Sequence, residues 1–169
     1  ALYELNEFDD SIQSYQNALA IKPDYAEAHN NLGNVFKAKG QLDLAIKSYG
    51  TAIDLKPDYI ESHYSLGTSF YESGKLKETV KCYERVLEFR PNFTEIHNNL
   101  GNVLKELGRL DDAVLSYKMA ISIDPDFVEV YFNLGTTFQE LNQLTDAVKY
   151  YKKAIDIKPD YPEAHNNLG

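Results

Sequence analysis

Histidine is the side chain in this sequence best suited to binding a metal, and its placement is regular. The same place in a pattern that returns every 34 residues is occupied by His29, His63, His97, Tyr131 and His165. Zinc needs its ligand nitrogens within about 2 Å of one ion. Histidines on successive repeats would lie on helices that pack about 8–10 Å apart, so we expect no metal site and no cofactor. Each ring is instead predicted to fill the aromatic packing slot of its repeat, where histidine can present a flat ring with a polar tip.

Cys82 is the only cysteine, which excludes an internal disulfide and a thiolate metal cage. A nucleophilic cysteine needs a base beside it, yet the equivalent places in other repeats hold Ser14, Ser48, Ser116 and Tyr150. No phosphate-binding loop, Gly-x-Ser-x-Gly elbow or dinucleotide fingerprint occurs. We therefore predict that the chain is not an enzyme. A lone thiol fits a reducing compartment, which predicts a cytoplasmic location.

The helices that position these residues can be located from the prolines. Five prolines fall at intervals of 34 residues, at Pro23, Pro57, Pro91, Pro125 and Pro159. Apolar or small residues three and four apart on both halves of each repeat predict two amphipathic helices per repeat. The predicted organisation is a single array with a partial repeat at 1–25, full repeats at 26–59, 60–93, 94–127 and 128–161, and a partial repeat at 162–169.

Helix boundaries are marked by residues with known local preferences. Asp24 and Glu27, and the equivalent pairs in later repeats, have the spacing of a capping box at the start of a first helix. Left-handed turn residues between the two helices are predicted at Asn6, Gly40, Gly74, Gly108 and Asn142. Single glycines inside helices, expected to allow close helix approach, are Gly33, Gly67, Gly101 and Gly135.

Composition excludes two classes of partner. The 169 residues are 43% hydrophobic and 25% charged, which is ordinary for a folded protein. A formal charge of -9, from 26 acidic and 17 basic residues, repels phosphate backbones, so nucleic acid is not expected as a partner. No apolar stretch approaches the roughly 20 residues needed to cross a bilayer, so no membrane segment is predicted.

The repeated pattern resembles the tetratricopeptide family over the whole chain. In the repeat at 94–127 the matching residues are Leu100, Gly101, Ala113, Tyr117, Ala120 and Pro125. The resemblance implies an all-α, right-handed superhelical solenoid of antiparallel helix pairs, in which first helices line a concave face. Each repeat buries its apolar side against its neighbours, which leaves a long surface for binding. The expected function is a protein–protein interaction scaffold that binds an extended peptide or protein segment.

Under that geometry the concave groove carries two polar ladders, because residues three apart on a helix share a face. The predicted peptide-binding residues are Asn31, Asn34, Tyr64, Ser65, Thr68, Asn99, Asn102, Phe132, Asn133, Thr136 and Asn167. Asparagine suits this role because its amide both donates and accepts hydrogen bonds. The alternative is that the amides bond each other or helix ends, and that Tyr64 and Phe132 cover neighbouring helices.

Some tetratricopeptide domains bind the terminal carboxylates of chaperones with a lysine clamp. The clamp position here holds Asn30, Tyr64, Asn98, Phe132 and Asn166, so this partner is not expected. The His-Asn-Asn-Leu-Gly motif at 29–33, 97–101 and 165–169 is more similar to the repeat region of O-linked N-acetylglucosamine transferases. The alternative function is a substrate-docking segment of such a glycosyltransferase, whose catalytic domain is absent from these residues.

Charge and chain ends yield two further expectations. First helices begin with glutamates, which make the groove acidic and predict a neutral or basic partner segment; these are Glu27, Glu61, Glu95, Glu129 and Glu163. The partial repeats at the two ends leave apolar flanks without a solvating cap, which predicts head-to-tail self-association.

Overall fold

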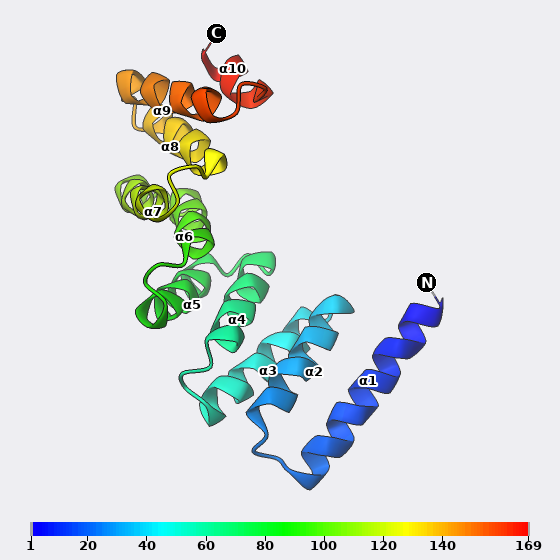
Figure 1. The fold of residues 1–169 in the computed structure, drawn as a ribbon. Coiled ribbons are helices and arrows are strands. Elements are labelled where there is room, and N and C mark those ends of the chain that lie inside the picture. Colours follow the sequence, from blue (N-terminus) through cyan, green and yellow to red (C-terminus); the bar gives the residue numbers. More distant parts are fainter. Residues whose placement is uncertain (1, 169) are drawn as a thin grey trace. The chain divides into compact units, whose positions relative to one another are not determined.

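The fold is made of helices throughout the part that the structure describes. The computed structural model describes the backbone of residues 2–168 and the side chains of residues 7–168. Within that range the helices are α1 (Leu2–Ile21), α2 (Ala26–Ala38), α3 (Leu42–Leu55), α4 (Ile60–Glu72), α5 (Leu76–Phe89), α6 (Thr94–Glu106), α7 (Leu110–Ile123), α8 (Val128–Glu140), α9 (Leu144–Ile157) and α10 (Pro162–Leu168) (Figure 1). The predicted all-α class is confirmed.

The chain divides into two compact units. Unit 1 ends at Phe89 and contains α1 to α5, and unit 2 begins at Arg90 and contains α6 to α10. Within each unit, helices that follow one another in sequence pack side by side (Figure 1). We call α2, α4, α6, α8 and α10 the first helices and the others the second helices. First helices of neighbouring repeats also touch, α2 with α4 and α6 with α8.

Left-handed residues close the first helices as predicted. The φ angles are 72° at Gly40, 71° at Gly74, 72° at Gly108 and 58° at Asn142. The turn predicted at Asn6 is wrong, because α1 continues without a break from Leu2 to Ile21. Asparagine is tolerated inside a helix at a modest cost, so the backbone keeps its helical hydrogen bonds there.

The predicted capping boxes do not form in α2, α4, α6 and α8. The N-cap residues are aromatic and make no side-chain capping bond; they are Tyr25, Tyr59, Phe93 and Phe127. The predicted capping aspartate lies one residue earlier, in a tight turn. At α4 the Tyr59 N–H donates to the Lys56 carbonyl at 3.0 Å, with Asp58 between them. The first-turn glutamates remain inside the helix, where they complement its positive end.

In α2, α4, α6 and α8 a glycine packs against a tyrosine of the following second helix. A Cβ added to the glycine would lie 2.7 Å from the ring of Tyr49 at Gly33, and the nearest approach is 2.8 Å at Gly67, 2.5 Å at Gly101 and 2.5 Å at Gly135. Side-chain carbons do not approach so closely, so any residue other than glycine would displace the ring. The predicted role of these glycines in close helix approach is confirmed.

Candidate functional site

The predicted binding residues lie on the first helices and stay accessible. We call them the ladder residues: Asn31, Asn34, Tyr64, Ser65 and Thr68 in unit 1, and Asn99, Asn102, Phe132, Asn133, Thr136 and Asn167 in unit 2. Each of these side chains is exposed or half-buried. The ladder residues are therefore not sealed between helices, although several of them are engaged within the fold.

In unit 1 a buried tyrosine orients the amide of Asn34. The Tyr49 hydroxyl donates to Asn34 Oδ1 at 2.8 Å, and the same ring packs against Gly33. The amide oxygen is therefore used inside the protein, and the Nδ2 group is left as the donor of an exposed side chain. Burial raises the pKa of Tyr49 to about 12, although a hydrogen bond with Ser65 lowers it slightly. The hydroxyl consequently stays protonated and keeps donating at neutral pH.

In unit 2 the same arrangement recurs one repeat pair later. The Tyr117 hydroxyl donates to Asn102 Oδ1 at 2.6 Å, and burial raises the pKa of Tyr117 as well. Asn167 is held differently, because its Nδ2 donates to the Tyr151 hydroxyl at 3.2 Å while that hydroxyl donates to Gln139 Oε1 at 2.8 Å. Asn34 and Asn102 are thus the two ladder asparagines whose oxygen is held by a tyrosine.

A lysine of α2 joins a threonine and a glutamate of α4. Lys37 Nζ donates to Thr68 Oγ1 at 2.8 Å and lies 3.0 Å from Glu72 Oε1. The Thr68 hydroxyl in turn donates to the Ser65 carbonyl at 2.9 Å. Thr68 is therefore already hydrogen-bonded in both directions, and the ion pair removes net charge from this part of the face.

The corresponding lysine of α6 makes the same contacts with α8. Lys105 Nζ donates to Thr136 Oγ1 at 2.8 Å and lies 3.1 Å from Glu140 Oε1. The Thr136 hydroxyl donates to the Asn133 carbonyl at 2.9 Å. Two predicted ladder threonines thus connect neighbouring repeats, a role that the sequence analysis did not assign to them.

An open hollow lies between α2 and α4 in unit 1. It has a volume of about 500 Å³ and is lined by Asn34, Lys37, Ala38, Tyr49, Tyr64, Ser65, Thr68 and Glu72. Tyr64 contributes aromatic surface, since it is 37% exposed and stacks on Tyr83 with ring centroids 6.4 Å apart. The hollow combines one oriented amide donor, one aromatic wall and one ion pair, a combination that suits a polypeptide main chain with an apolar side chain.

In unit 2 the position of Ser65 is occupied by Asn133, which is used within the fold. Asn133 Nδ2 donates to Asn98 Oδ1 at 3.0 Å and to Asn102 Oδ1 at 3.1 Å. For Asn133 the structure therefore shows the alternative considered from the sequence, in which the amides bond to each other. Phe132 is likewise half-buried, with its ring centroid 5.8 Å from that of Tyr151 and 5.3 Å from that of Tyr161.

The cause of this difference is a buried position on the same helices. In unit 1 the Ser62 hydroxyl donates to Asn30 Oδ1 at 2.9 Å, and Ser62 is 0% exposed. In unit 2 the equivalent residue is Val130, which has no donor for Asn98, although Asn98 is buried. A buried amide oxygen without a donor costs about 1–3 kcal/mol, so Asn133 supplies the missing bond.

The histidines fasten each first helix to the loop before it. Nε2 donates to a proline carbonyl six residues earlier, at 2.9 Å from His29, 2.9 Å from His63, 2.7 Å from His97 and 2.9 Å from His165. Tyr131 does the same through its hydroxyl at 3.0 Å. The polar tip of each of these side chains thus bonds to the backbone of the loop before its helix. Among the described residues no group of histidine, cysteine and carboxylate side chains could hold a metal ion.

Cys82 is buried on α5. Burial raises the pKa of its thiol to about 11, with a smaller contribution from Glu78. At neutral pH the group is a thiol and not a nucleophilic thiolate. Its environment is that of a packing residue.

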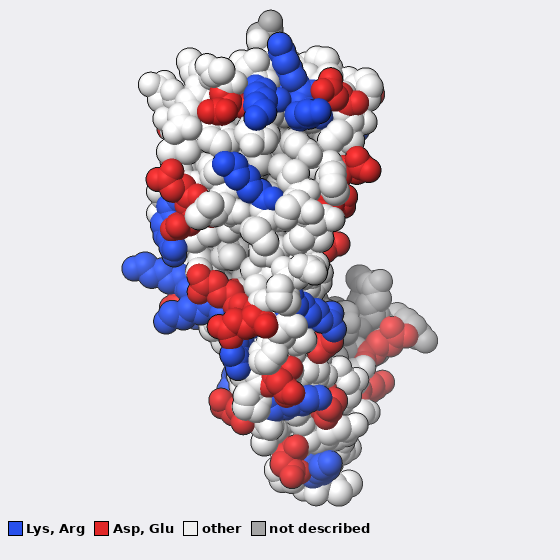
Figure 2. Space-filling model, turned by 60° about the vertical axis from the view of Figure 1, so that its left-hand side comes forward, with Lys and Arg blue, Asp and Glu red and all other residues white. Residues whose placement is uncertain are grey.

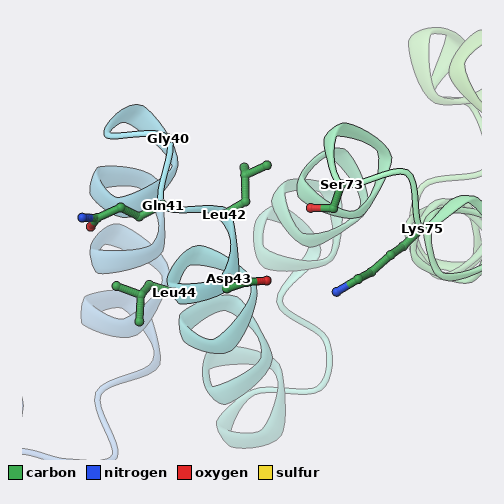
Figure 3. Close-up of a pocket in the computed structure, with 7 residues that line it drawn as sticks. All are labelled: Gly40, Gln41, Leu42, Asp43, Leu44, Ser73 and Lys75. Atoms are coloured by element: carbon green, nitrogen blue, oxygen red, sulfur yellow. The ribbon is translucent and has the colours of Figure 1, made fainter.

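A second hollow lies at the turns that follow α2 and α4 in unit 1. It measures about 580 Å³ and is lined by Gly40, Gln41, Leu42, Asp43, Leu44, Ser73 and Lys75 (Figure 3). Asp43 and Lys75 point toward one another across it, and the Ser73 hydroxyl faces the same space (Figure 3). No residue predicted to bind a partner lines this hollow.

Charges of both signs are mixed over the surface. On the face drawn in Figure 2, lysines and arginines are interspersed with aspartates and glutamates. Glu27, one of the first-turn glutamates, has Lys56 Nζ 3.6 Å from its Oε1. The acidic character predicted for the groove is thus reduced locally by ion pairs.

Sequence reasoning missed the tyrosines that orient Asn34 and Asn102, and also the lysine contacts. A signal was present, because each of these asparagines is followed three residues later by a lysine, Lys37 or Lys105. The tyrosines carry no such signal, since nothing in their spacing reveals where a hydroxyl points.

Comparisons with known proteins agree on one family. A TPR repeat model matches residues 1–40, 33–74, 67–108, 101–142 and 138–169. The crystal structure of YrrB, described as a TPR protein with an unusual peptide-binding site, is 26% identical with a TM-score of 0.88, covering 99% of this chain and 86% of that one. The crystal structure of MamA is 25% identical with a TM-score of 0.86, covering 93% and 92%.

A more distant structure, MamA from Desulfovibrio magneticus RS-1, has the same fold at 14% identity, with a TM-score of 0.83 over 93% of this chain and 89% of that one. No curated protein matches the sequence. Within the described residues, no helix has the length and apolar character needed to span a bilayer.

Proposed function

Because this chain belongs to the tetratricopeptide repeat family, we propose that it binds an extended peptide or protein segment on the ladder residues of its first helices. The observation that carries the proposal is the oriented amide of Asn34, whose oxygen accepts from Tyr49 at 2.8 Å beside an open hollow. The description of YrrB as a TPR protein with a peptide-binding site lends support from a relative with the same fold.

In this proposal Asn34 Nδ2 donates to a main-chain carbonyl of the partner. A carbonyl is present at every residue of a polypeptide, so this contact sets position and direction without demanding a particular sequence. Tyr64 provides a surface for one apolar side chain, since its ring is 37% exposed at the rim of the hollow. The Lys37–Glu72 pair then borders the segment without adding net charge.

We further propose that the partner segment is neutral or basic. Glutamates outnumber lysines on the first helices, and both lysines there, Lys37 and Lys105, already lie within 3.1 Å of a glutamate. An acidic segment would therefore meet net repulsion from glutamates that outnumber these lysines. Titration with matched acidic and basic peptides tests this point, and tighter binding of the acidic peptide would contradict it.

A substrate-docking role for a glycosyltransferase would use the same face. It differs in the partner, which would be a protein substrate presented to a catalytic domain instead of a lasting ligand. This role stays a prediction, as does the lack of a catalytic activity of its own. Cys82, a free buried thiol, agrees with the cytoplasmic location proposed from the sequence.

Head-to-tail self-association also stays a prediction. It is supported by Leu144 and Val148 on α9, which are 59% and 40% exposed, whereas Val114, the counterpart of Val148 on α7, is 7% exposed. Light scattering over a range of concentrations tests it, and a constant monomer mass at high concentration would contradict it.

The central test begins with selection of a binding peptide from a random dodecapeptide library displayed on phage. The affinity of the selected peptide is then measured for the wild-type chain and for Asn34→Ala. Loss of one hydrogen bond is expected to weaken binding about 5- to 10-fold.

The matched control is Asn17→Ala, because Asn17 is an exposed asparagine on α1 whose side-chain oxygen accepts from Gln13 of the same helix. It should bind like the wild type. Failure to select any peptide, or equal affinities of the two variants, would overturn the proposal.

A further inference from the structure

The chemistry of the first helices alternates between repeats instead of recurring in each one. Asparagine with a lysine three residues later occurs at Asn34 and Asn102, whereas threonine with a glutamate four residues later occurs at Thr68 and Thr136. The pair of helices recurs in every repeat, whereas the pattern of these side chains recurs in every second repeat.

The two kinds of repeat complete one another. Lys37 of α2 reaches Thr68 and Glu72 of α4, and Lys105 of α6 reaches the equivalent pair on α8, with distances that agree within 0.1 Å. A single repeat contains either the lysine or its acceptors. Two neighbouring repeats are thus the smallest segment that contains the whole arrangement, and each arrangement lies inside one unit.

Each pair of repeats contains one asparagine donor oriented by a tyrosine. Tyr49 holds the oxygen of Asn34 at 2.8 Å, and Tyr117 holds that of Asn102 at 2.6 Å. In the second repeat of unit 2, Tyr151 instead bonds to Gln139, since no asparagine is present at the Thr136 position. The oriented donor therefore appears once per pair and not once per repeat.

An aromatic residue follows the same rule. Tyr64 on α4 and Phe132 on α8 occur at equivalent places and lie against Tyr83 and Tyr151, with ring centroids 6.4 Å and 5.8 Å apart. The first repeat of each pair has asparagine at that place, Asn30 or Asn98, and both are buried. Each pair thus supplies one donor and one aromatic surface.

We infer that the binding unit of this protein is a pair of repeats, so that α2–α5 and α6–α9 form two separate sites, each accepting one short segment. Each site offers a main-chain carbonyl the Nδ2 group of Asn34 or Asn102, and offers an apolar side chain the ring of Tyr64 or Phe132. The inference rests on the proposed function and adds to it the number of sites, their composition and the positioning role of Tyr49 and Tyr117. The site in unit 1 binds more tightly, because Ser65 borders its open hollow whereas the equivalent Asn133 in unit 2 is bonded to Asn98 and Asn102.

The test uses the dodecapeptide selected above and follows the side-chain amide signals of Asn34 and Asn102 by NMR during titration. Both signals should shift and saturate, with the Asn34 signal saturating at lower peptide concentration. Asn34→Ala should leave the Asn102 response unchanged, and Asn102→Ala should leave the Asn34 response unchanged. Saturation of only one signal, or loss of both responses in either variant, would overturn the two-site inference.

Tyr49→Phe tests the positioning role, because it keeps the ring against Gly33 and removes only the hydroxyl. We expect several-fold weaker binding in unit 1, a changed Asn34 amide signal in the free protein, and unchanged binding in unit 2. Tyr117→Phe should give the mirror result. Wild-type binding by Tyr49→Phe would refute the role of the hydroxyl.

Failure of this inference can be told apart from failure of the proposed function. If the peptide binds but saturates one site, the two-site inference fails while peptide binding on the ladder residues stands. If Asn34→Ala combined with Asn102→Ala binds the peptide as tightly as wild type, both fail.

Discussion

Units 1 and 2 have nearly the same ladder residues but differ in what one equivalent pair of them, Ser65 and Asn133, contacts. Ser65 in unit 1 borders an open hollow, whereas Asn133 in unit 2 donates to Asn98 and Asn102. Judged from the sequence, Asn133 is the better ligand of the two, because an amide has more hydrogen-bonding groups than a hydroxyl. In the structure, however, the amide of Asn133 is already hydrogen-bonded to other side chains of the protein.

The difference teaches that a buried neighbour decides whether a surface amide is free. Ser62 supplies a hydrogen bond to buried Asn30, and Val130 cannot supply one to Asn98. In unit 2 the ladder residue Asn133 donates this hydrogen bond to Asn98 instead. One of its polar surface groups therefore stabilises the fold. Four experiments test this explanation of how the two units differ.

The largest effect is expected where the units are alike. Tyr49→Ala and Tyr117→Ala should each lower the free energy of unfolding by about 3–5 kcal/mol, because each removes a fully buried ring and leaves a cavity. Urea unfolding followed by circular dichroism measures the loss. Tyr25→Ala, at a ring that is 41% exposed, is the control and should cost less than about 1 kcal/mol. Clearly unequal losses for Tyr49 and Tyr117 would show that the shared packing is not equivalent.

A smaller effect is expected at the position that separates the units. Ser62→Val should destabilise the chain by about 1–3 kcal/mol, because Asn30 Oδ1 loses its donor while buried. Adding Ser65→Asn should recover much of this loss by reproducing the bond that Asn133 makes in unit 2. A double-mutant cycle gives the coupling free energy. Simple additivity of the two changes would contradict our explanation of the difference.

Removing the lysines should have a modest and equal effect in both units. Lys37→Met and Lys105→Met keep most of the side-chain volume and remove half-exposed ion pairs, which typically contribute 0 to about 1 kcal/mol. Unfolding at low and high salt measures the effect, which should shrink as salt screens the charges. A loss confined to one unit would argue against the equivalence of the two repeat pairs.

The last prediction concerns tyrosine ionisation, which has no effect at neutral pH. The pKa of Tyr49 is raised by burial from 10.0 to about 12, so the folded chain favours the neutral hydroxyl. The resulting stabilisation is complete below pH 10 and declines as the pH rises from 10 toward 12. Urea unfolding at pH 9 and pH 11 should show a smaller decline for Tyr49→Phe than for wild type, and an equal decline would contradict the assignment.

Much of the fold could be predicted because its determinants are local. Gly40 and Asn142 end first helices with positive φ because few other residues adopt that geometry without strain. Gly33 predicted a close approach between helices, and in the structure the ring of Tyr49 packs against it. The helix starts were misplaced by one residue because Asp58 satisfies the spacing of a capping box, yet proline directs it into a turn.

The site was predicted in outline and not in detail. The ladder positions are accessible, since helical periodicity determines which residues share a face. Periodicity does not reveal that the Asn34 oxygen is held by Tyr49, or that Asn133 bridges two other amides. Those bonds join side chains 15 to 35 residues apart, and their geometry depends on how the helices pack.

By itself the sequence determined the helices, their turns and the face on which each polar residue lies, because these depend on contacts within a few residues along the chain. Which amides are already hydrogen-bonded within the fold depends on how the helices pack together. A hydrogen bond between helices forms when donor and acceptor come within about 3 Å, and that depends on the packing of buried residues such as Ser62 and Val130.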